Sequence, residues 1–328
     1  MDFPEMFTYS VYGAIVFLLA QVFRNKENLQ LIVHVLIITV LVQIGIAIFE
    51  LFTGLHLPAS RLSTREYSTD YASSVYYNRN NFSFFLSSLS PIVFYKLLTE
   101  YENVRTRLIL LFVTFAGLFI IIWNGSRVAT FSYVAGILAV SGGFYLRKMK
   151  KQTVQWPRIG LSVYVMSALL YILLPLFSSN PFNRNTQGSL FTRWELMQSG
   201  SDNILSSPFR PAGLGAFGSA IPIAGNQLPA TAHNWATQLG VEVGLIGLFM
   251  FLISMGVLVD RLFSVYYNSV SEWALPVAVS LLIFPINGLG PSNVLAQSSI
   301  FWVLVGFGIS IVVITNKNKC FELAADRN

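Results

Sequence analysis

The sequence predicts an all-α, polytopic integral membrane protein, with about nine transmembrane helices in a single domain over residues 1–328. Of its 328 residues, 54% are hydrophobic and only 11% are charged, and the mean hydropathy is +0.60. Apolar runs of about 16–25 residues recur along the whole chain, and each is long enough to cross a bilayer as a helix. The charged residues gather in the connections between these runs.

Nine apolar runs account for most of the chain. We expect them at Tyr9–Phe23, Leu29–Phe52, Phe82–Leu98, Leu108–Trp123, Arg127–Tyr145, Leu161–Phe177, Asn234–Val259, Trp273–Leu289 and Ala296–Ile314. Two polar segments interrupt the series: a first loop at residues 53–81 and a longer one at residues 178–232, directly before the seventh span.

The lysines predict which ends of the spans face the cytoplasm. All seven lie in alternate, short connections: Lys26, Lys96, Lys148, Lys150, Lys151, Lys317 and Lys319. This is the positive-inside pattern, so the net charge of +6 does not indicate a nucleic-acid partner. Both long polar segments are then extracytoplasmic. An odd number of spans also puts the N-terminus outside, so either the first span is re-entrant or further helices precede it in longer relatives.

Metal chemistry has no support in the sequence. The single cysteine, Cys320, lies in the C-terminal tail, which leaves no disulfide framework and no thiolate site. The three histidines, His34, His56 and His233, have neither ligand spacing nor a carboxylate pair beside them. We therefore expect no metal and no cofactor.

Every basic residue on the predicted outer side is an arginine. These residues are Arg61, Arg65, Arg79, Arg127, Arg184, Arg193 and Arg210. A guanidinium group binds phosphate oxygens in a bidentate manner, which an ammonium group cannot do. The pattern suggests a ligand that carries phosphate at the outer surface. General exclusion of lysine from outer loops would give the same pattern.

Two of these arginines lie at predicted helix starts. The sequence Thr192-Arg193-Trp194-Glu195 reads as a capping box, so a short surface helix is expected to begin near Arg193 and to end at Gly200. Arg193 would then lie at the depth of lipid diphosphates, or act as an interfacial anchor. Arg127 opens the fifth span, where the helix dipole opposes a cation; a bound anion would offset this, as would solvation.

Residues Gly213 to Gly218 have the form G-x-G-x-x-G. A dinucleotide site needs a strand before this motif and a helix after it, in a βαβ unit. Here prolines and an outer loop surround it, so we reject a nucleotide site. Gly213 and Gly215 either bring backbone N–H groups close to an anion or form a tight turn.

His233 stands where the seventh span begins, next to Asn234. The helix dipole and the nearby arginines disfavour the imidazolium form, and a neutral imidazole is what a general base requires. A histidine that only makes structural hydrogen bonds is the other reading. There is no G-x-S-x-G elbow for a serine hydrolase.

Polar residues continue into the seventh span. Gln238 and Glu242 follow Asn234 at i+4 and i+8, which puts the three on one helix face. Gly240, Gly244 and Gly247 would let another helix approach closely. Such a stripe at membrane depth points to function, although a bundle interior with satisfied hydrogen bonds would also explain it.

Together these motifs resemble those of the O-antigen ligase and O-antigen polymerase superfamily. The His-Asn signature and the later Glu-x-Gly-x-x-Gly match the start of the seventh span, and the Arg-Trp and Gly-x-Gly elements match the loop before it. Ser126-Arg127 and Asn78-Arg79-Asn80-Asn81-Phe82 resemble two earlier elements, with Arg79 in place of the usual proline. The matching residues are Arg127, Arg193, Trp194, Gly213, Gly215, His233, Asn234, Glu242, Gly244 and Gly247.

The resemblance implies a metal-independent, extracytoplasmic glycosyltransferase of the GT-C type in the bacterial cytoplasmic (inner) membrane. Its donor is a glycan on undecaprenyl diphosphate, and its acceptor is a lipid-core sugar for a ligase or another glycan for a polymerase. Arg127 and Arg193 would bind the diphosphate, and His233 would deprotonate the acceptor hydroxyl. Substrate contacts would come from Asn234, Arg210, Arg79, Glu242, Gly213 and Gly215. A transporter or flippase of a lipid-linked glycan is the alternative that involves no catalysis.

Overall fold

The computed structural model describes residues 3–22, 26–61, 63, 69–148, 159–177, 181, 188–221, 232–268, 271–290 and 298–325. Every regular element in these ranges is a helix, which confirms the all-α class. The helices are α1 (Phe3–Val22), α2 (Lys26–Thr53), α3 (Arg79–Thr99), α4 (Val104–Trp123), α5 (Arg127–Lys148), α6 (Ile159–Phe177), α7 (Gly188–Ser206), α8 (Phe217–Ala220), α9 (Trp235–Tyr267), α10 (Ala274–Asn287) and α11 (Ser299–Ala325).

Each predicted span coincides with one of these helices. Within the described ranges, α2, α3, α4, α5 and α9 are long and apolar enough to cross a bilayer. Shorter apolar stretches lie in α1, α6, α10 and α11. The helices therefore suit a multi-pass membrane protein, because a helix satisfies all its backbone hydrogen bonds internally. The count of nine spans stays a prediction.

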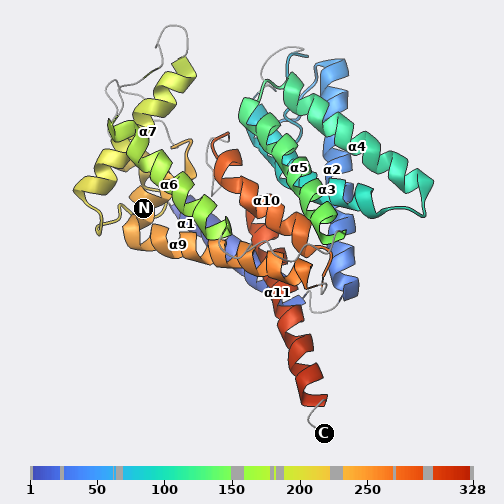
Figure 1. Ribbon diagram of the computed structural model, residues 1–328. Coiled ribbons are helices and arrows are strands. Elements are labelled where there is room, and N and C mark those ends of the chain that lie inside the picture. Colours follow the sequence, from blue (N-terminus) through green and yellow to red (C-terminus); the bar gives the residue numbers. More distant parts are fainter. Residues whose placement is uncertain are drawn as a thin grey trace.

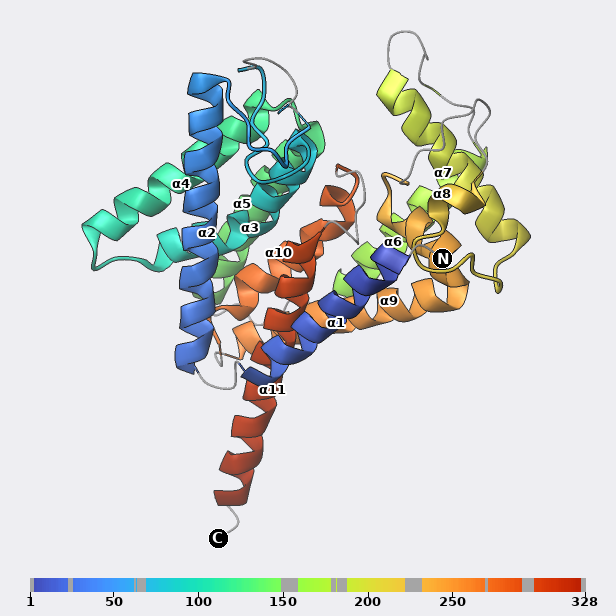
Figure 2. The ribbon, with the colours of Figure 1, turned by 180° about the vertical axis from the view of Figure 1, so that it is seen from behind.

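Helix α10 lies at the centre of the molecule. It packs against α3, α5, α6, α9 and α11, and nearly all its side chains are buried. Its sequence is apolar all the way round, as a helix enclosed on every side requires. Figures 1 and 2 show α10 between one group formed by α2, α3, α4 and α5 and a second group that contains α1, α6, α7 and α9.

Helix α3 joins the first group to α10 through small polar side chains. Ser87 donates a hydrogen bond to Asn287 Oδ1 at 2.8 Å, and Asn287 Nδ2 donates to Ser88 Oγ at 2.9 Å. Small residues allow helices to approach closely, and inter-helix hydrogen bonds satisfy polar groups that lipid could not. These contacts fix the C-terminal end of α10 against the first half of α3.

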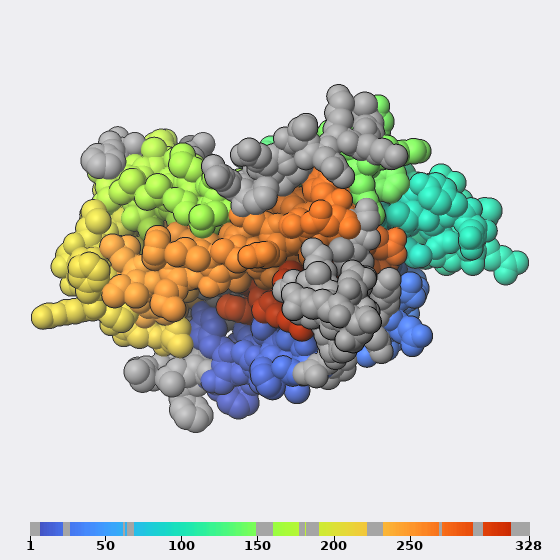
Figure 3. Space-filling model, turned by 60° about the horizontal axis from the view of Figure 1, so that its bottom comes forward, coloured from blue at the N-terminus to red at the C-terminus, as the bar shows by residue number. Residues whose placement is uncertain are grey.

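Helix α9 has one side in contact with its neighbours and one side free. Figure 3 shows it as a band across one face of the molecule, with α6 along one edge and α1 near the other. Its outward residues are large and apolar, among them Ile246, Phe249 and Met250. Such a stripe is suited to contact with lipid chains.

Candidate functional site

The N-terminus of α9 is capped from within the chain. Asn234 has an extended backbone, and its Oδ1 accepts hydrogen bonds from the N–H groups of Ala236 at 3.0 Å and Thr237 at 3.4 Å. The Asn234 side chain is fully buried. An N-cap of this kind stabilises a helix by about 1 kcal/mol. It also fixes the direction in which the preceding residue, His233, enters the site.

His233 is held in an unusual backbone conformation. Its φ is 50°, in the left-handed region that residues other than glycine seldom adopt. The residue is partly buried, directly before the capping Asn234. Strain of about 1–3 kcal/mol at one residue persists only where the surroundings enforce it, and such residues concentrate at functional sites. The start of the span, where the sequence placed His233, is therefore a structurally constrained position.

The predicted polar face of α9 is present and buried. Gln238 Nε2 donates a hydrogen bond to Glu242 Oε1 at 3.1 Å. Glu242 is 2% exposed, so its carboxyl group lies inside the protein and away from lipid. The spacing predicted from the sequence therefore brings these two groups together one turn apart.

Two residues after Glu242, α9 is broken. Gly244 has φ 71° and ψ 177°, which only glycine adopts easily. The sequence indicated a small-residue packing motif here and did not predict a break. Gly240 does serve in packing, since a Cβ there would overlap Ile204 of α7.

The loop after α7 satisfies the backbone groups that this break exposes. The N–H of Leu245 donates a hydrogen bond to the main-chain carbonyl of Pro208 at 2.9 Å. In the other direction, the N–H groups of Ala212 and Gly213 donate to the main-chain carbonyls of Val241 at 2.9 Å and Glu242 at 3.1 Å. A broken helix is tolerated at membrane depth only when protein partners replace its missing hydrogen bonds. The Gly-x-Gly loop is thus attached directly to the helix that His233 precedes, and Gly213 and Gly215 both have positive φ.

Arg193 binds the end of the central helix. Its Nη1 donates to the carbonyl of Leu289 at 3.0 Å, and its Nη2 donates to Gly290 at 3.4 Å. Both acceptors follow the C-terminus of α10, where the helix dipole favours a cation. The Arg193 side chain is partly buried, and this burial lowers the pKa of the guanidinium.

Helix α7, which carries Arg193, is longer than predicted. The expected start near Arg193 and stop at Gly200 are wrong, because the helix runs from Gly188 to Ser206. Thr192 therefore lies inside the helix and is not its cap. Gly200 is a packing residue, since a Cβ at this position would overlap Thr237 of α9.

Arg193 and the start of α9 meet at the same end of α10. Trp235, the first residue of α9, donates a hydrogen bond from Nε1 to the carbonyl of Pro285 at 3.0 Å. Arg193 binds the carbonyl of Leu289, one turn further on. His233, two residues before Trp235, is therefore attached to the same structural unit as Arg193.

Arg127 and Arg79 belong to the other group of helices. Arg127 is the first residue of α5 and is exposed. Arg79 is the first residue of α3, and its Cζ lies 3.5 Å from the centroid of the Tyr71 ring. Figures 1 and 2 show α7 and the N-terminal end of α5 on opposite sides of the end of α10. Arg210 is exposed in the loop after α7, whereas Arg65 and Arg184 lie outside the described residues.

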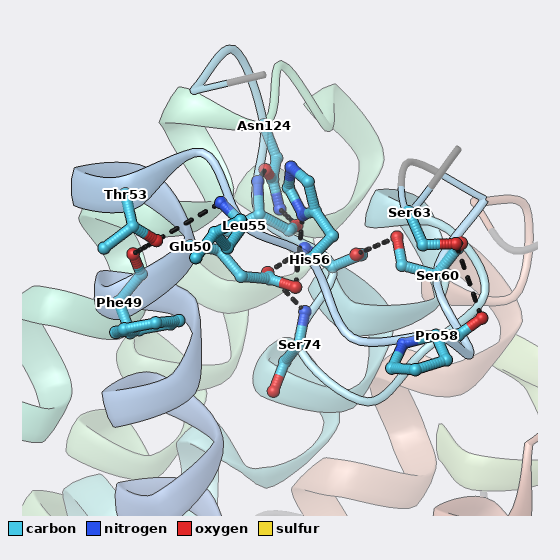
Figure 4. A network of polar contacts seen from close by, with 12 residues as sticks. Phe49, Glu50, Thr53, Leu55, His56, Pro58, Ser60, Ser63, Ser74 and Asn124 are labelled. Carbon is cyan, nitrogen blue, oxygen red and sulfur yellow. Dashed lines mark hydrogen bonds and ion pairs between the residues drawn. The ribbon is translucent and has the colours of Figure 1, made fainter. Parts of the chain in front are cut away.

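A buried polar network near Arg127 was not singled out from the sequence (Figure 4). Glu50 Oε2, at the end of α2, accepts hydrogen bonds from Ser73 N–H and Ser74 N–H, both at 2.8 Å. Glu50 Oε1 lies 3.2 Å from His56 Nδ1, and both side chains are almost fully buried. One sequence signal was available, since Glu50 is a carboxylate within an otherwise apolar run.

Comparisons with known proteins bear on the same residues. The O-Antigen ligase family model matches residues 111–252, a region that contains Arg127, Arg193 and His233. The resemblance to the O-antigen ligase and polymerase family is confirmed. The chain is also 24% identical over 336 residues to the teichuronic acid biosynthesis protein TuaE of Bacillus subtilis (strain 168). No solved structure matches the chain.

The similarity to TuaE is broad but incomplete. The aligned region covers 93% of this chain and 65% of TuaE, so the chain spans less than two thirds of that relative's length. The O-antigen ligase match, in contrast, runs from α4 into the middle of α9. It includes α7 and the Gly-x-Gly loop, the two elements that contact the first part of α9.

Proposed function

We propose that the protein is a metal-independent glycosyltransferase at the extracytoplasmic face of the bacterial cytoplasmic membrane. The proposed donor is a glycan linked to undecaprenyl diphosphate, and the acceptor is a hydroxyl group of another glycan or a lipid-core sugar. One observation carries this proposal: Arg193 and the start of α9 are bound to the same end of α10. The proposed cation for the leaving group, Arg193, and the proposed base for the acceptor, His233, are therefore both held at the C-terminal end of α10.

His233 is the proposed base. As the acceptor oxygen forms its bond to the anomeric carbon, the imidazole takes the hydroxyl proton. The bond from the anomeric carbon to the phosphate oxygen breaks, and the lipid diphosphate leaves with the electron pair. Asn234 fixes the entry of His233 into the site by capping α9. Positioned bases contribute about 10²–10⁴-fold to a rate.

Arginines are the proposed ligands of the leaving diphosphate. Cationic donors aimed at a developing charge stabilise a transition state. Arg193 is bound to the same end of α10 as the start of α9. Arg210 is exposed in the loop after α7, and Arg127 and Arg79 are fully or partly exposed in the other group of helices. The loop after α7 contains Gly213 and Gly215, and the first part of α9 contains Glu242. We assign these three residues to substrate contacts.

The names of the matching family and relative support a role in surface-polysaccharide synthesis. TuaE is named for the biosynthesis of teichuronic acid, and the family model is named for O-antigen ligase. We therefore place this chain in surface-polysaccharide synthesis, as a polymerase or a ligase.

A lipid-linked-glycan transporter or flippase is the second candidate, because of the break in α9. Transporters use discontinuous helices at their binding sites, and Gly244 interrupts α9 beside the buried Glu242. Here, however, the loop at Pro208–Gly213 satisfies the broken backbone. Arg193 and the start of α9, which His233 precedes, are both bound to the end of α10, and this favours chemistry at the surface.

One experiment separates the two functions. The purified protein in liposomes is given a lipid-linked glycan and candidate acceptors. The proposal expects a new glycosidic bond and free undecaprenyl diphosphate. Movement of intact donor between leaflets, without a new bond, would establish the transporter instead.

A further inference from the structure

We propose that Glu50 and Asn124 are positioning residues that hold Arg127 and Arg79 as one anion-binding unit for the donor diphosphate. This inference rests on the proposed function. It concerns the group of helices on the other side of α10 from His233. Neither Glu50 nor Asn124 reaches the ligand, and both act through the segment that follows α2.

The first anchor is the Glu50 carboxylate. A buried carboxylate is costly unless hydrogen bonds satisfy it. Here two consecutive backbone N–H groups, those of Ser73 and Ser74, donate to the same oxygen. Ser74 has φ 52°, a conformation that helps to turn both N–H groups towards one acceptor. The end of α2 therefore fixes the segment at residues 73 and 74.

The other oxygen of Glu50 organises the preceding part of the loop. His56 Nδ1 lies 3.2 Å from Glu50 Oε1. Close by, the hydroxyl groups of Ser60 and Ser73 share a hydrogen bond of 2.6 Å. Two stretches of the loop are thus tied together around a single carboxylate, as Figure 4 shows.

Asn124 connects this loop to Arg127. Its Oδ1 accepts from the N–H of Ala72, and its Nδ2 donates to the carbonyl of Ala72, both at 2.9 Å. Nδ2 also lies 3.3 Å from Ser83 Oγ, on α3. Asn124 is fully buried at the C-terminus of α4, and α5 begins with Arg127 three residues later. The loop therefore determines where α5, and with it Arg127, begins.

The same loop orients Arg79. Arg79 Cζ lies over the ring of Tyr71, the neighbour of Ala72, at 3.5 Å from the ring centroid. Stacking on an aromatic face leaves the N–H edges of a guanidinium available to an anion. Tyr71 thus contacts Arg79 on α3 through its ring, and through its backbone Ala72 contacts Asn124, which ends α4 three residues before Arg127. Loosening this segment would misplace two cations at once.

The test measures binding of undecaprenyl diphosphate itself, so it needs no transfer reaction. Glu50→Ala and Asn124→Ala are expected to weaken binding about tenfold, because about 1.4 kcal/mol corresponds to a factor of ten. Glu50→Gln, which keeps an acceptor for the two N–H groups, should lie between Glu50→Ala and the wild type. Glu50→Gln also replaces Glu50→Ala as the test variant if the alanine variant does not fold.

A double-mutant cycle distinguishes positioning from a general loss of stability. The same substitutions are made in an Arg79→Lys/Arg127→Lys protein, which keeps the charges and loses the guanidinium geometry. If Glu50 and Asn124 act through the arginines, their effects fall below about twofold there, because coupled residues are not additive. Equal effects in both backgrounds, or unchanged binding in Glu50→Ala and Asn124→Ala, would overturn the proposal.

A matched control is a buried contact between α4 and α5, the helices on either side of Asn124. Tyr133 on α5 donates a buried hydrogen bond of 2.7 Å to the carbonyl of Thr114 on α4. Tyr133→Phe removes an α4–α5 contact without touching the loop, so binding should stay at the wild-type level. Failure of the proposed function is seen separately: a wild-type protein that binds the lipid and forms no glycosidic bond contradicts catalysis and leaves the positioning test valid.

Discussion

The guanidinium of Arg193 donates a hydrogen bond to the main-chain oxygen of Leu289 at 3.0 Å. This contact joins α7, which lies between two spans, to the end of the most buried helix of the bundle. A second donor of the same guanidinium reaches Gly290 at 3.4 Å. Arg193 therefore has a fixed orientation before any ligand binds, as electrostatic catalysis requires.

Replacement of Arg193 by lysine tests this geometry. An ammonium group carries the charge, but it cannot reproduce the planar fork that spans two carbonyls or two phosphate oxygens. We expect Arg193→Lys to lower the rate of glycan transfer about tenfold or more, the effect of losing one charged hydrogen bond of about 1.5–3 kcal/mol. Arg261→Lys, at an exposed position near the other end of α9, is the control. A wild-type rate in Arg193→Lys would show that only bulk charge matters.

A side chain at Gly244, where α9 is broken, is expected to lower the stability of the protein. Gly244 has φ 71°, and a Cβ there would lie 3.2 Å from the carbonyl oxygen of Pro208. Gly244→Ala is expected to destabilise the protein by about 1–3 kcal/mol, seen as a lower Tm in detergent. Gly142 in α5 has no atom within 4 Å of its Cβ position, so Gly142→Ala should keep or slightly raise the wild-type Tm, because alanine favours a helix over glycine. Equal Tm values for both variants would contradict the strained break.

Lysine placement predicts the orientation in the membrane, and cysteine labelling tests it. In a Cys320→Ser background, Ser63→Cys and Ser207→Cys, both at exposed positions, should react with a membrane-impermeant thiol reagent on intact cells. Glu102→Cys, exposed in the connection from α3 to α4, should react only after permeabilisation. The reverse pattern would place the candidate site in the cytoplasm and exclude the proposed reaction.

The helical spans could be predicted because lipid leaves the backbone few choices. A long apolar run must form its own hydrogen bonds, so hydropathy alone locates the helices. The start of α9 was predicted from the change from a polar loop to an apolar run at Asn234, and the structure shows that Asn234 caps the helix. The Gln238–Glu242 pair follows from that start by helical spacing, and His233 lies directly before the cap.

The remaining features depend on contacts that local sequence does not encode. Gly200 resembles a helix stop, but it is needed for contact with Thr237. Gly244 resembles a packing glycine, but the loop at Pro208 stabilises a break there. Asn124 binds Ala72, which is 52 residues away in sequence. Such pairings arise only when the helices pack together.

The central claim is that His233 acts as a base in glycosyl transfer. His233 precedes the Asn234 cap with φ 50°, so its position is set by backbone and not by a mobile side chain alone. His233→Gln keeps a polar side chain of similar reach and removes the basic nitrogen. Donor binding, which we assign to the arginines, should therefore stay close to the wild-type value.

The most direct measurement is single-turnover transfer from pre-bound lipid-linked glycan, for the wild type and His233→Gln, across a range of pH. A general base predicts a rate about 10²–10⁴-fold lower in the variant at unchanged donor affinity. It also predicts that the wild-type rate falls on acidification, because a protonated imidazole cannot accept a proton, and that the variant lacks this fall. Transfer at the wild-type rate by His233→Gln would contradict the account.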